Sequence, residues 1–307
     1  GFLVVLPLWR MPRARCQLLL LFVPYAFAIF SDDFNAWLVK NFGADVQAQL
    51  NRADLDTMGS FGGKTEPTEQ VQKDPVVFVH GVSDRAWDKP KYTGDFFKTY
   101  SHQWSELYGT TYANGSQNNP LQWAQYAMQC KYVKQVRMLI VAVHYYTARP
   151  VNLVAFSLGV PISRKAILGG RCVETGEDLG EPLTPFMETF VGVSGPNHGI
   201  RFEKGFSFCS ILSMPICHKK VGVNVKECPE ETDFLKDINS KVGYEGKVVF
   251  TIASKADAVV PYLVCGKRTA KIEGQIGEKL YENKTHDETY VDSYEVIRQM
   301  VLNHVVV

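Results

Sequence analysis

The sequence has almost no net charge, and it contains no internal repeat and no low-complexity segment. Its 33 lysines and arginines nearly balance its 32 aspartates and glutamates, which leaves a formal net charge of +1. This balance provides no field that would attract nucleic acid or a strongly acidic substrate. Hydrophobic residues make up 46% and charged residues 21% of the chain, as in an ordinary globular protein. The composition therefore predicts a folded chain without a nucleic-acid partner.

The cysteines lack the C-x-x-C spacing of a zinc or redox motif, which argues against both kinds of site. Cys16 falls in an N-terminal segment that we expect to be removed. An even number remains, which in an exported chain indicates disulfides whose pairing the sequence leaves open. Buried free thiols are the alternative. The six remaining residues are Cys130, Cys172, Cys209, Cys217, Cys228 and Cys265.

The apolar run near the N-terminus, Leu18–Ala28, is too short for a clear membrane span. It contains Pro24 and falls short of the roughly 20 residues that a spanning helix needs. The surrounding signals are those of a signal peptide, namely Met11 as a better start than Gly1, the basic Arg13 and Arg15, and the small-x-small site Ala26-Phe27-Ala28. The alternative is a retained anchor that also uses Phe2–Trp9, but arginines interrupt that run.

The chain is therefore predicted to be secreted. We expect residues 1–28 to hold upstream residues and the signal peptide, and residues 29–307 to form a single domain. The glycosylation sequons at Asn114 and Asn283 are compatible with export.

Four apolar, β-branched runs read as strands that are buried on both faces, and each ends at a polar or reactive residue. They are Val76–Val79, Val151–Phe156, Thr189–Val193 and Lys247–Ala253. Helical patterns lie before, between and after them, at Phe34–Gln49, Asp95–Leu107, Leu121–Tyr145, Leu158–Leu168 and Tyr290–Val301. This alternation predicts a mostly parallel sheet with helices on both faces. In such sheets, chemistry gathers at the carboxyl ends of the strands.

The segment Ala155-Phe156-Ser157-Leu158-Gly159 has the pattern of a nucleophile elbow. A buried strand runs directly into Ser157 and a helix follows directly. The strained turn requires small residues two before and two after the serine, and Ala155 and Gly159 satisfy this, although Ala155 departs from G-x-S-x-G. The helix N-terminus would place its positive dipole beside the hydroxyl. The alternative is an ordinary turn with a capping serine.

A nucleophilic serine needs a base and an orienting acid, which follow it in the order acid, then histidine. Asp257 is the first acid after the run that ends at Ala253, although alone it would read as a surface residue. His286, in a polar loop before the last helix, is the predicted base. His304 ends that helix and reads as structural. Asp287 and Asp292 are competing acids that lie too close to His286 in sequence to orient its ring.

The oxyanion hole of such a site combines two backbone N–H groups. One would come from Leu158, after the nucleophile. The other would come from Val82, because His80-Gly81-Val82 follows the first predicted strand. His80 itself reads as a structural residue that holds this loop. A simple turn at His80-Gly81 is the alternative.

Three other patterns resemble functional sites but argue weakly for them. Met58–Thr65 differs by one glycine from a P-loop, and no strand precedes it. His198, in Asn197-His198-Gly199, precedes Asp257 and reads as a wall of the cleft. An aromatic cluster could line a groove, although core packing is favoured; it comprises Trp104, Tyr108, Tyr112 and Trp123.

Taken together, these motifs resemble the class 2 lipase family. The residues that carry the likeness are Pro75–Val82, Ala155–Gly159, Gly195–Gly199 and His286, and Val160–Leu183 is similar to its secreted animal branch. The likeness covers roughly Ser60 to Leu302. It implies an α/β-hydrolase fold, a triad of Ser157, Asp257 and His286, and oxyanion donors at Val82 and Leu158.

The small bacterial members of that family lack a lid, whereas this chain has a longer stretch at residues 200–244 that holds three cysteines. We hypothesise that this stretch is a disulfide-pinned cap over the cleft.

The sequence thus predicts a secreted lipase or carboxylesterase that cleaves acylglycerols or other lipid esters through an acyl-enzyme. No metal or organic cofactor is needed for this chemistry. A phospholipase, thioesterase or acyltransferase on the same triad is one alternative, because specificity resides in loops and pockets. A non-catalytic lipid-binding protein is another.

Overall fold

The computed structural model describes residues 29–115, 126–201 and 214–307. Several predicted features lie partly or wholly outside these residues. They are the signal peptide in residues 1–28, the start of the helix predicted at 121–145, Trp123, Cys209, and residues 202–213 of the predicted cap. Within the described part of the chain, no helix is long and apolar enough to span a membrane.

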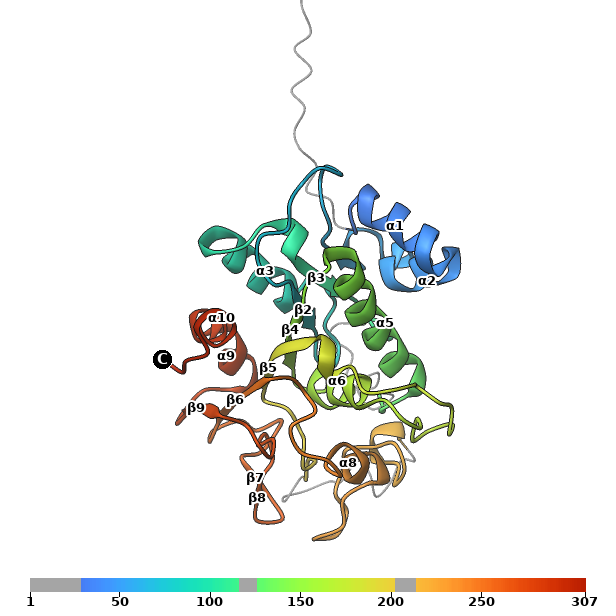
Figure 1. The fold of residues 1–307 in the computed structure, drawn as a ribbon. Helices are drawn as coiled ribbons and strands as arrows, with labels where there is room; N and C mark the ends of the chain where they lie inside the picture. Colours follow the sequence, from blue (N-terminus) through green and yellow to red (C-terminus); the bar gives the residue numbers. More distant parts are fainter. Residues whose placement is uncertain (1–28, 116–125, 202–213) are drawn as a thin grey trace, which may run out of the picture.

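A central sheet organises the described residues, with strand order β1-β3-β2-β4-β5-β6-β9 (Figure 1). All neighbours are parallel except β1, which runs antiparallel to β3. The strands are β1 (Ser60–Phe61), β2 (Val76–Val79), β3 (Leu107–Thr110), β4 (Val151–Phe156), β5 (Met187–Val193), β6 (Val248–Ser254) and β9 (Gly277–Tyr281). A small hairpin, β7 (Leu263–Val264) and β8 (Lys267–Arg268), lies apart from this sheet. The predicted mostly parallel sheet is confirmed.

Strand β4 lies in the middle of the sheet because it has a partner on each side. Val154 pairs with Phe78 of β2 and with Val191 of β5. Every residue of β4 is buried, as expected for an apolar run covered on both faces. The carboxyl end of β4 therefore meets those of its neighbours at one edge of the sheet.

Helices cover both faces of the sheet, and Figure 1 shows them as two groups. One face packs in a core with α1 (Asp32–Phe42), α2 (Ala44–Asn51), α5 (Cys130–Thr147), α6 (Gly159–Leu168) and α8 (Asp233–Ile238). The other packs in a second core with α3 (Lys89–Tyr100), α9 (His286–Val291) and α10 (Tyr294–Asn303). Short 3-10 helices are η1 (Ala53–Met58), η2 (Trp104–Glu106), η3 (Thr184–Phe186) and η4 (Pro215–Cys217).

Several predicted helices have wrong bounds. The pattern at Phe34–Gln49 forms two helices, α1 and α2, which Gly43 separates, and the pattern at Tyr290–Val301 spans the end of α9 and most of α10. The helix expected at Asp95–Leu107 is α3, which begins at Lys89 and ends at Tyr100, and Leu107 belongs to strand β3. The pattern misled because Trp104 and Leu107 are spaced like a helix face, although they belong to η2 and β3. The helix expected from Leu121 begins at Cys130, since residues 126–129 are not helical.

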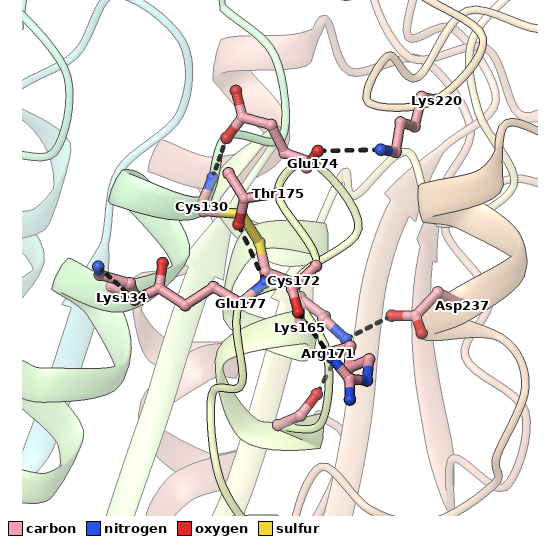
Figure 2. The surroundings of a disulfide bond; sticks show 12 residues. Cys130, Lys134, Lys165, Arg171, Cys172, Glu174, Thr175, Glu177, Lys220 and Asp237 are labelled. Atoms are coloured by element: carbon pink, nitrogen blue, oxygen red, sulfur yellow. Dashed lines mark hydrogen bonds and ion pairs between the residues drawn. A yellow bond between two sulfur atoms is a disulfide. The ribbon is translucent and has the colours of Figure 1, made fainter.

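Two disulfides confirm that cysteines pair in this chain. Cys130–Cys172 joins the start of α5 to the loop after α6, and the Glu174 carboxylate accepts a hydrogen bond from the Cys130 N–H at 2.7 Å (Figure 2). Cys228–Cys265 joins the segment before α8 to the β7–β8 hairpin. This second bond ties part of the predicted cap to the β7–β8 hairpin, and the cap itself stays a prediction.

Candidate active site

Ser157 lies at the sharp turn between β4 and α6. Its backbone is left-handed, with φ of 52°, a conformation that costs a non-glycine residue energy and persists only when its surroundings enforce it. Here the Ser157 N–H donates to the Val193 carbonyl on β5 at 2.9 Å. The Cβ of any larger residue at Gly159 would lie 2.4 Å from the His80 carbonyl oxygen. The expected strand–turn–helix elbow is therefore present.

The structure brings Ser157, Asp257 and His286 into one hydrogen-bonded line. His286 Nε2 lies 2.9 Å from Ser157 Oγ, and His286 Nδ1 lies 2.7 Å from Asp257 Oδ2. The Asp257 side chain is 1% exposed and that of His286 is 12% exposed. This arrangement can remove a proton from Ser157 and stabilise the resulting imidazolium.

The loop after β6 fixes the Asp257 carboxylate. Its Oδ1 accepts hydrogen bonds from the N–H groups of Val259 and Val260, both at 2.9 Å. Its Oδ2 is thereby left to face His286. Asp257 is thus far more constrained than the surface residue that its sequence context alone suggests.

Ser254, the last residue of β6, links the acid loop to the histidine loop. Its hydroxyl accepts from the Ala256 N–H at 3.2 Å and from the Lys284 N–H at 3.1 Å. The local sequence does not reveal this role, because a lone serine at a strand end carries no signal for it.

His286 is the first residue of helix α9 rather than a loop residue. Thr285 caps this helix in a capping box with Glu288, in which each side chain accepts from the other residue's backbone N–H. The pattern Thr285-x-x-Glu288 is a known helix-start signal that could have corrected the prediction. The Phe156 ring packs against the imidazole, with ring centroids 4.7 Å apart. The cap and this ring together hold the imidazole in place.

The loop after β2 approaches the elbow closely. A Cβ at Gly81 would lie 3.0 Å from the Ser157 Cβ, so glycine allows the close contact. Among the residues that the structure describes, the N–H groups of Val82 and Leu158 have no hydrogen-bond acceptor. Unpaired N–H groups beside a buried serine are what an oxyanion hole requires.

His80 holds this loop, as predicted from its position. Its Nε2 accepts from the Tyr112 N–H at 3.1 Å, its Nδ1 faces the Gly81 carbonyl at 2.7 Å, and its ring stacks on Tyr112. These contacts assign the proton to Nδ1. Burial lowers the pKa of His80 to about 3, so the ring is neutral at physiological pH.

The other candidate residues lie outside the line of three. His304 Nε2 contacts Thr189 Oγ1 at 3.2 Å, and His198 Nδ1 contacts Glu231 at 2.9 Å. Lys89 and Lys284 form ion pairs with Asp287 and Asp292. Tyr108 and Tyr112 are fully buried in the core.

Nothing in the described structure supports a P-loop or a metal centre. Ser60–Phe61, inside the P-loop-like segment, is the edge strand β1. The described part of the chain contains no cluster of three or more histidine, cysteine or acidic residues that could hold a metal ion.

The chain is similar to a known protein family. A family model described as Lipase (class 2) matches residues 73–299. No curated protein sequence matches the chain significantly.

Solved structures also resemble the fold. Aspergillus fumigatus lipase B is 14% identical with a TM-score of 0.51, and the match covers 87% of this chain and 70% of that one. The Paleococcus ferrophilus monoacylglycerol lipase is 12% identical over 80% of this chain and 98% of that one, with a TM-score of 0.48. The mouse alpha/beta hydrolase domain-containing protein 10 is 12% identical over 77% and 93%, with a TM-score of 0.45. At such identities the likeness concerns the fold alone, and the predicted α/β-hydrolase architecture is confirmed.

Proposed function

The chain belongs to the class 2 lipase family, a family of ester hydrolases, and from this premise we propose that it is a secreted serine hydrolase of lipid esters. The observation that carries the proposal is the line of contacts from Ser157 Oγ through the imidazole of His286 to Asp257, at 2.9 Å and 2.7 Å. Secretion is supported by disulfides, which persist in oxidising compartments.

The proposed reaction is acyl transfer in two steps. His286 accepts the proton of Ser157 Oγ as that oxygen attacks the ester carbonyl, and the N–H groups of Val82 and Leu158 bind the oxyanion. The imidazolium then gives its proton to the leaving alcohol, and an acyl-serine forms. In the second step water loses a proton to His286 and attacks the acyl-serine; the imidazolium returns that proton to Ser157 Oγ as the acyl–oxygen bond breaks, and the carboxylic acid is released. Asp257 orients the ring and stabilises its charge throughout.

Covalent labelling with a fluorophosphonate probe tests whether Ser157 is an activated nucleophile. The secreted protein should label, and Ser157→Ala should not. Ser194→Ala is the matched control, because Ser194 directly follows the neighbouring strand β5, has a similar φ of 47° and is also buried. We expect Ser194→Ala to label like the wild type. Folded wild-type protein that does not label would contradict catalysis and favour the non-catalytic lipid-binding alternative.

A substrate panel then separates the remaining alternatives. Emulsified triacylglycerols of short and long chains, water-soluble short-chain esters, phosphatidylcholine vesicles and an acyl thioester should be compared at equal enzyme concentration. A lipase is expected to turn over the emulsified triacylglycerols fastest. Preference for the phospholipid or the thioester would assign the same triad to a different substrate.

A further inference from the structure

Two short segments carry groups that the proposed function needs, and neither can hold its own position. One is the loop at residues 80–88, which contains Val82 and has a left-handed residue at Ser83. The other is α9, a helix of only six residues that begins with His286. Helices this short are not stable without tertiary contacts. Each segment therefore depends on neighbouring side chains for its placement.

Lys89, at the start of α3, contacts both segments. Its Nζ lies 3.1 Å and 3.3 Å from the carboxylate oxygens of Asp84 in the loop, and 3.0 Å from Asp287 Oδ1, next to His286. The same ammonium lies 5.3 Å from the centre of the Phe156 ring, which packs against the imidazole. A single cation thus contacts the loop, the helix and the residue before the nucleophile.

The charges around Lys89 are arranged to keep this contact. The Lys89 side chain is 18% exposed and that of Asp84 is 11% exposed. Burial lowers the pKa of Lys89, but Asp84 and Asp287 together raise it above its ordinary value. The ammonium is therefore charged across the physiological range, and it lies between two carboxylates.

We propose that Lys89 is a positioning residue that couples the loop at residues 80–88 to helix α9, so that the oxyanion donor and His286 keep a fixed relation to Ser157. The inference rests on the proposed function for its catalytic consequence. A second contact lies one helical turn along α3, where the hydroxyl groups of Thr93 and Tyr290 form a hydrogen bond of 3.0 Å. This contact joins α3 to α9 without reaching the loop, whereas the Lys89 ammonium contacts both segments.

The test compares Lys89→Met, Lys89→Arg, Asp287→Asn and the wild type. Lys98→Met is the control, because Lys98 is exposed on the same helix. Lys89→Met should lower the fluorophosphonate labelling rate and kcat by roughly 10-fold to 100-fold, the scale expected when reacting groups are misplaced by about 1 Å, with KM nearly unchanged. Lys89→Arg should restore most of the rate, since it keeps a charged donor. Lys98→Met should match the wild type.

Asp287→Asn keeps the test decisive if Lys89→Met does not fold. The Asp287 side chain is 71% exposed, so its replacement should leave the fold intact while slowing labelling in the same direction by a smaller factor. A folded Lys89→Met protein with the wild-type rate would overturn the proposal. If Lys89→Met does not fold, a wild-type rate in Asp287→Asn would overturn it. So would a Lys89→Arg protein as slow as Lys89→Met.

Hydrogen exchange separates failure of this inference from failure of the proposed function. Lys89→Met should accelerate amide exchange both at residues 80–88 and in α9, and Lys98→Met in neither. If folded wild-type protein does not label, the proposed function fails. Exchange then decides about Lys89, because acceleration in both segments supports the coupling and acceleration in one alone refutes it.

Discussion

Gly159→Ala sets two physical effects of opposite sign against each other. Gly159 is the first residue of α6, and alanine is favoured over glycine in helices by at most about 1 kcal/mol. Against this gain, the new Cβ would lie 2.4 Å from the His80 carbonyl oxygen and 2.9 Å from that of Val79. Both are backbone atoms of the chain leaving β2, which cannot rotate away as a side chain can. Overpacking of this kind costs about 1–3 kcal/mol.

The clash should therefore win. We expect Gly159→Ala to lower the free energy of unfolding by about 1–2 kcal/mol, which for a domain of this size lowers Tm by about 2–4 °C. Labelling by the fluorophosphonate probe should slow as well, because the displaced His80 peptide leads directly to Val82.

Gly94→Ala is the matched control for this experiment. Gly94 lies inside α3, and its new Cβ would come no closer than 3.4 Å to any atom outside its own helix, the nearest being a ring carbon of Trp104. Helix propensity should act alone there and raise stability by about 0.5–1 kcal/mol. Both variants can be compared by calorimetry and by labelling rate. If Gly159→Ala were as stable and as reactive as the wild type, the close packing between elbow and loop would be refuted.

Three further predictions follow from described contacts. Asp257→Asn should keep the turn at Val259 but lower kcat by about 10⁴-fold, as loss of the orienting carboxylate does in serine hydrolases with such triads. A kcat within tenfold of the wild type would exclude Asp257 as the orienting acid. Because burial lowers the pKa of His80 from 6.5 to about 3, the unfolded state binds the extra proton, so stability should fall as pH drops from 6.5 toward 3. In His80→Gln that fall should be shallower by up to about 1.4 kcal/mol per pH unit, as measured by Tm against pH, and equal slopes would contradict this origin. Replacing Cys228 and Cys265 together by serine opens a loop with a sequence separation of 37 and should lower stability by about 3–4 kcal/mol. Calorimetry should show this as a lower Tm, and an unchanged Tm would contradict it.

The central strands and the three aligned residues could be predicted because strong local patterns mark them. Val76–Val79 and Val151–Phe156 are continuous apolar runs, and their bounds match β2 and β4. The order of Ser157, Asp257 and His286 follows the order of the strands whose carboxyl ends meet at one edge. Because parallel pairing brings the carboxyl ends of these strands to one edge, the residues that follow them lie close together, and the sequence carries enough information to propose the site.

The remaining features depend on tertiary contacts that no local pattern records. Strand β9 has half-buried residues throughout and includes Glu278 and Lys279, so it lacks an apolar run. Strand β3 is short and follows directly on η2, where the spacing of Trp104 and Leu107 imitates a helix face. The link through Lys89 joins residues of three separate segments, which only the folded chain brings together.

The long separation between Ser157 and His286 has a consequence for how the protein is made. The two side chains meet across 129 positions of the chain, and α9 follows every strand of the central sheet. A chain that emerges from the ribosome with its N-terminus first has synthesised the nucleophile long before the base exists. Under the proposed mechanism, Ser157 therefore gains its base only once strand β9 and the helix after it have joined the sheet.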